Sequence, residues 1–168
     1  MVRIVGACCI TAGCAAFGFS MAAASRREEA YVARFLAALE YMSCELSYRM
    51  SPLPTLCRGA GEVAGGYVGQ LLTELARELE KQTAPDVQVC VHTLLERTSP
   101  EGEVARLFRE LGSTLGRFDL PGQLRGLDSA IRSAGESLRR IRDGAGQRRR
   151  NYQTLGLCAG AAMAILFL

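Results

Sequence analysis

The sequence predicts an all-α protein: an antiparallel bundle of about six helices over residues 26–150, flanked by a transmembrane helix at each end, 1–25 and 151–168. Apolar residues between the ends recur every three or four positions, and no sustained alternating pattern typical of a strand interrupts them. No charged residue stands between Ile4 and Ala24, or between Tyr152 and Leu168. Hydrophobic residues make up 49% of the chain, an ordinary fraction, so the placement of charge rather than composition predicts the membrane segments.

The two terminal segments differ in length. As helices rising about 1.5 Å per residue, the first reaches about 31 Å and can cross a bilayer core of about 30 Å, whereas the second reaches about 25 Å. The second segment is strongly apolar only from Leu155, so the sequence leaves open whether it crosses fully. Ala22–Ala24 and Thr11–Cys14 are alternative signal-peptidase and lipoprotein cleavage sites, but the apolar run is longer than the usual signal core of about 7 to 15 residues. We therefore expect a retained span.

The first helix of the bundle continues directly from the N-terminal span. Its apolar positions step by three and four: Val32, Phe35, Leu39, Met42 and Leu46. Pro52 and Pro54 end this helix, because proline lacks the amide hydrogen that a helix interior needs. The next helix is weakened by five glycines between Gly59 and Gly69 before leucines restore the period, so we expect it in two pieces.

The remaining helices carry their own start and stop signals. Asp86 is placed to cap a short helix, and Ser99 before Pro100 is interpreted as the cap of the next, which Gly116 terminates. Asp119 caps the longest helix, whose apolar residues keep a seven-residue repeat: Leu120, Leu124, Leu127, Ile131, Ala134, Leu138, Ile141 and Ala145. Such a repeat can also build a two-chain coiled coil, but short connections between one-sided helices favour a bundle that closes on itself.

Arginines beside the two spans set the predicted topology. Arg26 and Arg27 follow the first span and Arg148, Arg149 and Arg150 precede the second, against Arg3 alone on the far side. Short flanks rich in arginine face the cytoplasm, so we expect the bundle in the bacterial cytosol and the protein in the cell membrane. The same five arginines can also attract anionic lipid headgroups, which is the alternative to a role in topology alone.

No enzyme signature is found in the sequence. The glycine-rich stretch lacks the Gly-Lys-Ser/Thr ending of a phosphate-binding loop, and Lys81 is the only lysine. His92 is the only histidine, and we expect it to be a partly buried packing residue. The three cysteines of the bundle are too widely spaced for a disulfide framework or a zinc site, so we expect each to be a small buried residue: Cys44, Cys57 and Cys90. We predict no enzyme activity, no cofactor, no metal and no small-molecule substrate.

Nucleic-acid binding is the next class considered. Arg125, Arg132 and Arg139 repeat every seven residues along the last helix, but no aromatic residue stands among them to stack on bases. The rest of the bundle is nearly balanced in charge, whereas binding to phosphates needs a clear basic excess. A solvated or protein-docking face is therefore the prediction, and no nucleic-acid partner is expected.

Three motifs, in order, resemble the stage III sporulation protein AB family of endospore-forming bacteria. LEYMSCELSYRMSPLP, Leu39–Pro54, is similar to that family's leucine-rich helix ending in Glu, Tyr and Pro-Leu-Pro. LGSTLGRFDLPGQL, Leu111–Leu124, is similar to its paired Leu-Gly steps followed by Asp and Gln, and the apolar tail from Tyr152 resembles its Tyr and Leu-Gly ending. Together with the N-terminal span, the resemblance extends over nearly the whole chain.

The resemblance implies a part of the mother-cell complex that builds a secretion-like channel across the membranes around the forespore. Family members look like a reduced inner-membrane platform protein of type II secretion, with a cytosolic six-helix bundle. The implied partners are other channel proteins, including a secretion-type ATPase. The rival interpretation is a membrane-tethered adaptor whose bundle binds a signalling partner. The glycine-rich segment 59–69 departs from the family pattern.

A candidate partner-binding edge lies at the end of the first helix. Glu45 stands four residues before Arg49 and can pair with it, as an ordinary surface pair does. The alternative is that the polar and proline residues there form a docking edge for a protein partner: Tyr41, Glu45, Tyr48, Pro52 and Pro54.

Overall fold

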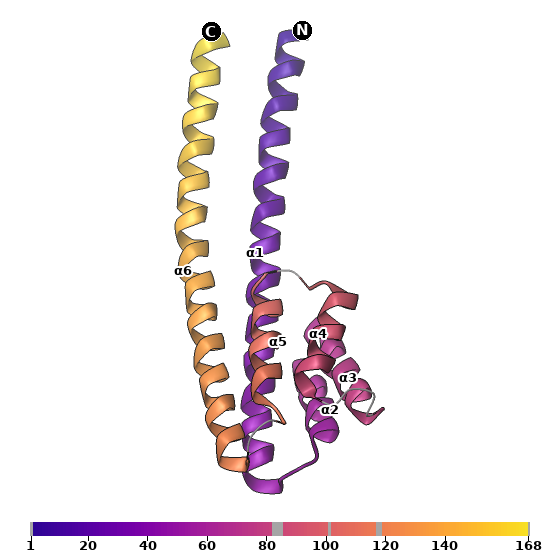
Figure 1. Cartoon of the computed structure of the whole chain (residues 1–168). Helices are drawn as coiled ribbons and strands as arrows, with labels where there is room; N and C mark the ends of the chain where they lie inside the picture. The colour runs from indigo at the N-terminus through magenta and orange to yellow at the C-terminus, as the bar shows by residue number, and fades with distance from the viewer. Residues whose placement is uncertain (1, 82–85, 101, 117–118, 168) are drawn as a thin grey trace. The chain divides into compact units, whose positions relative to one another are not determined.

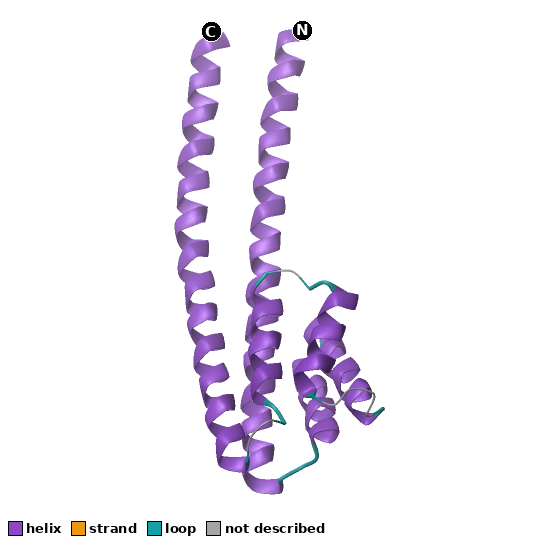
Figure 2. Cartoon of the chain, in the orientation of Figure 1, coloured by secondary structure: helices purple, strands orange, loops and turns teal. Residues whose placement is uncertain are grey.

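The computed structural model describes the backbone of residues 2–81, 86–100, 102–116 and 119–167, and the side chains of residues 26–81, 86–100, 102–116 and 119–144. Within these residues there are six helices and no strand, which confirms the all-α class (Figure 1, Figure 2). The helices are α1 (Val2–Arg49), α2 (Leu53–Ala64), α3 (Gly66–Glu80), α4 (Val87–Thr98), α5 (Glu103–Thr114) and α6 (Leu120–Phe167).

The chain divides into two compact units. One unit is Glu28–Arg139, and the other joins Met1–Arg27 with Arg140–Leu168. The predicted spans 1–25 and 151–168 lie outside the residues whose side chains are described, so both stay predictions. In the part of the chain that is described, no helix combines the length and the apolar character needed to cross a membrane.

The core of Glu28–Arg139 uses the residues that the periodicity predicted. The five predicted apolar positions of α1 are all buried, from Val32 at 0% exposed to Leu46 at 6%. Phe35 of α1 packs against Phe108 of α5 with ring centroids 4.8 Å apart, within the range of separations that interacting aromatic pairs show. On α6 only part of the predicted stripe is buried, namely Leu127, Ala134 and Leu138, together with Ala130 and Ser137, which the heptad pattern did not include.

Two predicted helix caps are confirmed and one is wrong. The Asp86 carboxylate accepts from the amide of Gln88 at 3.3 Å, and that of Asp119 accepts from Gly122 at 3.2 Å. Ser99 instead ends α4: it has φ of 42°, and its amide donates to Leu95 O at 2.8 Å. The physical reason is that Ser99 and Gly102 both have positive φ, so the chain leaves helical geometry at Ser99 and α5 begins only at Glu103.

The predicted break in the second helix is confirmed at Gly65. Gly65 and Gly66 have φ of 58° and 55°, a region that glycine enters at little cost, so α2 stops and α3 turns back along it. Where the two helices pass, a Cβ on Gly61 would stand 2.9 Å from Gly69 O, and one on Gly69 would overlap Gly61 O. The glycines that weaken the segment as one helix therefore allow close packing of two.

Candidate functional site

The corner between α1 and α2, residues 44–54, contains most of the predicted partner-binding residues. Helix α1 ends at Arg49, Met50 takes φ of 50°, and Pro52 (φ −57°, ψ 144°) precedes the first residue of α2. Pro54 lies in the first turn of α2, where an amide has no intrahelical acceptor, so the ring costs no hydrogen bond there. The two prolines thus both end one helix and permit the next.

Glu45 connects the two sides of this corner. Its side chain is 16% exposed and pairs with Arg49, with Nη1 and Oε1 3.6 Å apart, as the four-residue spacing predicted. The same Oε1 accepts from the Ser51 hydroxyl at 2.9 Å. Because Ser51 stands beyond the helix end, this hydrogen bond holds the turn against α1.

Tyr41 lies against α2. A Cβ added at Gly59 would overlap the Tyr41 ring, so this ring occupies the space that the glycine leaves, and Tyr41 is half-buried. Replacement of Gly59 by a larger residue would push the ring away. Tyr41 and Glu45 are therefore both engaged inside the protein, and they shape the corner.

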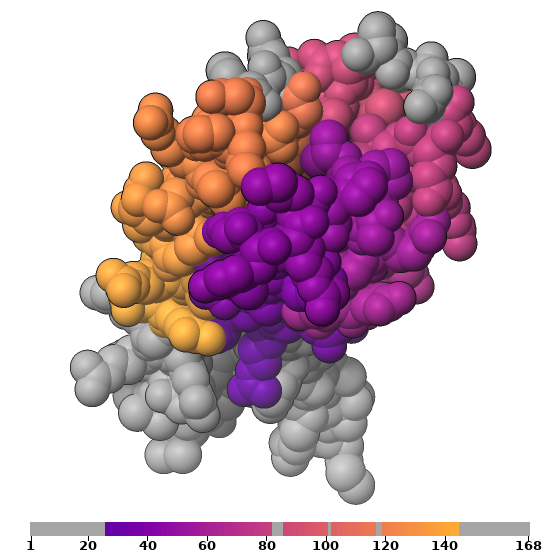
Figure 3. Space-filling view, turned by 90° about the horizontal axis from the view of Figure 1, so that it is seen from below, coloured from indigo at the N-terminus to yellow at the C-terminus, as the bar shows by residue number. Residues whose placement is uncertain are grey.

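Tyr48 and Met50 project from the corner into solvent. Their exposed fractions are 85% and 68%, the two highest among the large apolar residues with described side chains. The Arg49 side chain between them is 76% exposed, and Pro52 is exposed too. Tyrosine, methionine and arginine are enriched at protein interfaces, so this corner presents the residue types that bind proteins. Figure 3 views this end of the molecule, where α1 and α2, in purple, lie in the middle of the surface.

The strain at Met50 is a feature that sequence reasoning missed. A residue just past a helix end that takes positive φ is usually glycine, because a side chain there has a steric cost. Here the position is methionine, and most of its side chain is in water. A backbone conformation of this cost at an exposed apolar residue is a reason to suspect function.

The arginines that were predicted to lie beside the membrane are only partly described. Arg26 and Arg27 are exposed. Arg148, Arg149 and Arg150 lie outside the residues whose side chains are described, so their predicted role at a membrane surface stays a prediction.

Two predictions about possible chemistry are wrong. His92 is not a packing residue: its side chain is 67% exposed and Nδ1 lies 3.5 Å from Glu96 Oε1. Cys44 is exposed, because it lies on the outward face of α1, whereas Cys57 and Cys90 are buried as expected. Burial raises the pKa of the Cys57 thiol to about 12, which keeps it protonated and unreactive. Among the residues described, no three His, Cys, Asp or Glu side chains are grouped as a metal would require.

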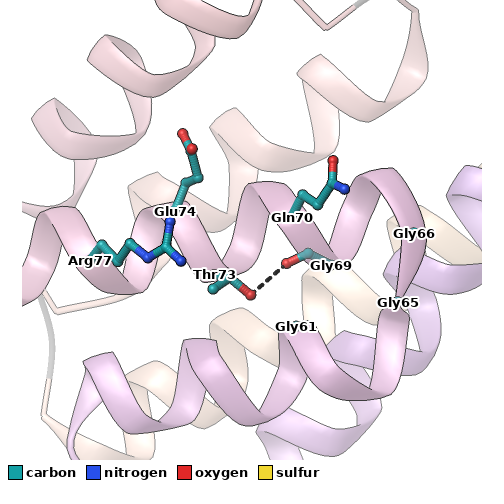
Figure 4. Close-up of a pocket in the computed structure, with 8 residues that line it drawn as sticks. All are labelled: Gly61, Gly65, Gly66, Gly69, Gln70, Thr73, Glu74 and Arg77. Atoms are coloured by element: carbon teal, nitrogen blue, oxygen red, sulfur yellow. Dashed lines mark hydrogen bonds between the residues drawn. The ribbon is translucent and has the colours of Figure 1, made fainter.

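A groove of about 380 Å³ runs along the α2–α3 hairpin. Figure 4 shows its lining residues: Gly61, Gly65, Gly66, Gly69, Gln70, Thr73, Glu74 and Arg77. The Thr73 hydroxyl is used within α3, donating to Gly69 O at 2.8 Å, and Glu74 pairs with Arg97 of α4 at 2.7 Å. The lining has no histidine, cysteine or lysine, and its threonine and glutamate are already engaged in these interactions.

Residues 3–168 match the model of a family described as stage III sporulation protein AB. The match covers the three sequence motifs and confirms the resemblance that they indicated. No curated protein and no solved structure shows significant similarity to the chain.

Proposed function

The chain belongs to the stage III sporulation protein AB family, and we propose that it is a membrane-anchored, non-catalytic part of the channel that the mother cell builds toward the forespore. In this proposal the bundle couples a cytosolic secretion-type ATPase to the membrane complex, as a reduced platform protein of type II secretion would. The observation that carries the proposal is the family match over residues 3–168, nearly the whole chain.

The distribution of charge supports a membrane anchor at each end. Both terminal segments are free of charged residues, and arginines flank them on the side of the bundle. In the proposed topology Glu28–Arg139 lies in the cytosol of the mother cell, on the same side as the proposed ATPase partner. Protease added outside intact protoplasts should leave the region between Arg26 and Arg150 uncut. Digestion of that region from outside would contradict the proposed topology.

The exposed residues of the α1–α2 corner are the proposed docking surface for a channel partner. Tyr48 and Pro52 contact the partner, together with Met50 and Arg49, because their side chains are in solvent. Tyr41, Glu45 and Pro54 act indirectly by holding the corner in shape. Loss of an exposed residue should therefore weaken binding without changing the fold.

Single substitutions test this division of roles. Tyr48→Ala should lower sporulation while the protein level in the membrane stays normal, since 85% of this side chain is in water. Val89→Ala is the matched control, because Val89 is also an exposed apolar residue, at 46%, but lies on α4. Glu45→Ala should lower the protein level, because Ser51 and Arg49 lose their partner.

The same comparison of Tyr48→Ala with Val89→Ala can also contradict the proposed docking surface. If Tyr48→Ala sporulates as well as Val89→Ala, the corner does not bind a required partner. A photo-crosslinking residue at position 48 then gives an independent measurement: in sporulating cells it should crosslink to a channel protein, and one at position 89 should not.

A further inference from the structure

Helices α1 and α6 bury very different residues in the Glu28–Arg139 unit. The buried face of α1 is Val32, Phe35, Ala38, Leu39, Met42 and Leu46, and that of α6 is Leu127, Ala130, Ala134, Ser137 and Leu138. Hydrophobic stabilisation grows with the apolar area removed from water, so α6 is held less firmly by this effect than α1.

Small residues let α6 approach α5 closely. A Cβ added at Gly126 of α6 would overlap the Thr114 side chain of α5, so the two helices touch at this point. One and two turns further along, α6 offers Ala130 and Ala134, which are 1% and 0% exposed. The hydrophobic contribution of α6 therefore comes mainly from its two buried leucines, and these small residues add little to it.

A cluster of polar side chains adds a second attraction between α5 and α6. We call it the Arg106 cluster; its members are Glu103, Arg106 and Glu110 of α5 and Ser133 and Ser137 of α6. Arg106 Nη2 donates to Glu103 at 2.7 Å, to Ser137 at 2.9 Å and to Ser133 at 3.2 Å. Arg106 Nη1 donates to Glu110 at 3.2 Å, and the Ser133 hydroxyl donates to Glu110 at 3.0 Å. One guanidinium thus joins both helices.

One serine of α6 is buried in this cluster, whereas the arginine on α5 is partly exposed, and this difference favours separation of the two helices. Ser137 is 1% exposed and is the single buried polar side chain among the residues described, whereas the Arg106 side chain is 42% exposed. Water can therefore reach the arginine and both carboxylates as soon as α6 moves. Separation of the helices would leave no charged group both buried and unpaired, which is the usual obstacle to opening an ionic contact.

The remaining helices keep their own contacts without α6. Phe35 packs on Phe108 between α1 and α5, the α2–α3 glycines pack together, and a Cβ at Gly112 of α5 would stand 2.9 Å from Val91 of α4. The first and last of these contacts tie α5 to α1 and to α4.

We propose that residues 120–139 of α6 form a releasable strap over α5, and that Arg106 is the residue that holds the strap closed. Release bares the carboxylates of Glu103 and Glu110 on α5 while α1–α5 stay folded. Local opening of one cooperative segment is a common property of native proteins.

Hydrogen exchange on the full chain, followed segment by segment by mass spectrometry, tests the proposal. In the unmodified protein, amides of 121–139 should exchange faster than those of α1 between residues 32 and 46. Arg106→Ala should speed exchange in 121–139 about tenfold or more, since hydrogen bonds to charged groups are among the stronger ones, and should leave 32–46 unchanged. Arg97→Ala is the matched control, because Arg97 also bridges two glutamates, Glu74 and Glu78, but between α3 and α4.

The proposal would be overturned by equal exchange in the two segments of the unmodified protein, by no effect of Arg106→Ala, or by an even rise in every segment. An effect of Arg97→Ala on 121–139 as large as that of Arg106→Ala would do the same. If Arg106→Ala does not fold, Ser137→Ala replaces it, because this change removes the buried hydroxyl on the α6 side and keeps the charges. It should speed exchange in 121–139 alone.

Discussion

Replacement of Gly69 by alanine tests the close packing of α2 against α3. The added methyl group would overlap the carbonyl oxygen of Gly61, which belongs to helix backbone and cannot rotate away. Forcing extra atoms into a packed contact costs about 1–3 kcal/mol, and the upper part of this range applies because backbone must move. Alanine also gains about 1 kcal/mol over glycine inside a helix. We therefore expect a net loss of about 1–2 kcal/mol.

Gly135→Ala is the control for helix propensity. Gly135 lies inside α6, and an added Cβ would find nothing within 4 Å. This variant should gain about 0.5–1 kcal/mol from the same replacement without any collision. The two glycine-to-alanine changes should thus move stability in opposite directions, by about 1.5–3 kcal/mol relative to each other.

Thermal unfolding of the full chain in detergent, followed by far-ultraviolet circular dichroism, measures the difference. At roughly 4 °C for each kcal/mol in a unit of this size, Tm should fall by about 4–8 °C for Gly69→Ala and rise by a few degrees for Gly135→Ala. If Gly69→Ala unfolds at or above the temperature of Gly135→Ala, α2 and α3 do not pack through their glycines. The explanation of the glycine-rich segment would then be wrong.

Three smaller predictions concern single side chains. Cys57, whose pKa is raised to about 12 by burial, should resist iodoacetamide at pH 8 in the folded protein while exposed Cys44 reacts, as peptide mass spectrometry would show. Hydrogen bonds, first from Lys81 and then from Arg97, hold the pKa of Glu78 in the folded protein below its ordinary value. The ionised Glu78 therefore stabilises the fold fully at pH values above the pKa of the unfolded chain, and this stabilisation is lost as pH falls through the lower pKa of the folded protein. Lys81→Ala should raise the pKa of Glu78 measured by NMR titration. Asp86→Ala should destabilise the protein by about 0.5–2 kcal/mol in chemical denaturation, because α4 loses its cap.

The fold was predictable because its signals are local. Apolar spacing identified α1, α3, α4 and α5, and the predicted core positions of α1 are buried without exception. Asp86 and Asp119 marked helix starts correctly, because a carboxylate two or three residues before the unpaired amides of a first helical turn can accept hydrogen bonds from them. The error at Ser99 has the same origin: serine can bond to backbone on either side, and only the positive φ at Ser99 and Gly102 decides which helix it serves.

The candidate site was predictable only in part. The helix pattern located the corner and the Glu45–Arg49 pair, but it could not separate the engaged Tyr41 from the exposed Tyr48, because their difference depends on α2 returning with Gly59 beside Tyr41. Met50 could not be recognised at all, because positive φ at a methionine leaves no mark in the sequence. A glycine in its place would have been the normal sign of such a helix end.

Arg97 and Arg106 each bridge two glutamates, and the spacing of their partners along the sequence does not indicate which arginine joins distant helices. Arg97 reaches back 19 and 23 residues to Glu78 and Glu74 on one exposed surface, where water competes for every bond. Arg106 pairs with Glu103 and Glu110 on its own helix, an arrangement that the sequence presents as an ordinary surface pattern. Arg106 also donates to the buried Ser137 of α6, 31 residues away, and this hydrogen bond connects α5 with α6. A heptad rule that expects apolar residues would discard Ser137, so the residue that gives Arg106 its importance is the one that periodicity leaves out.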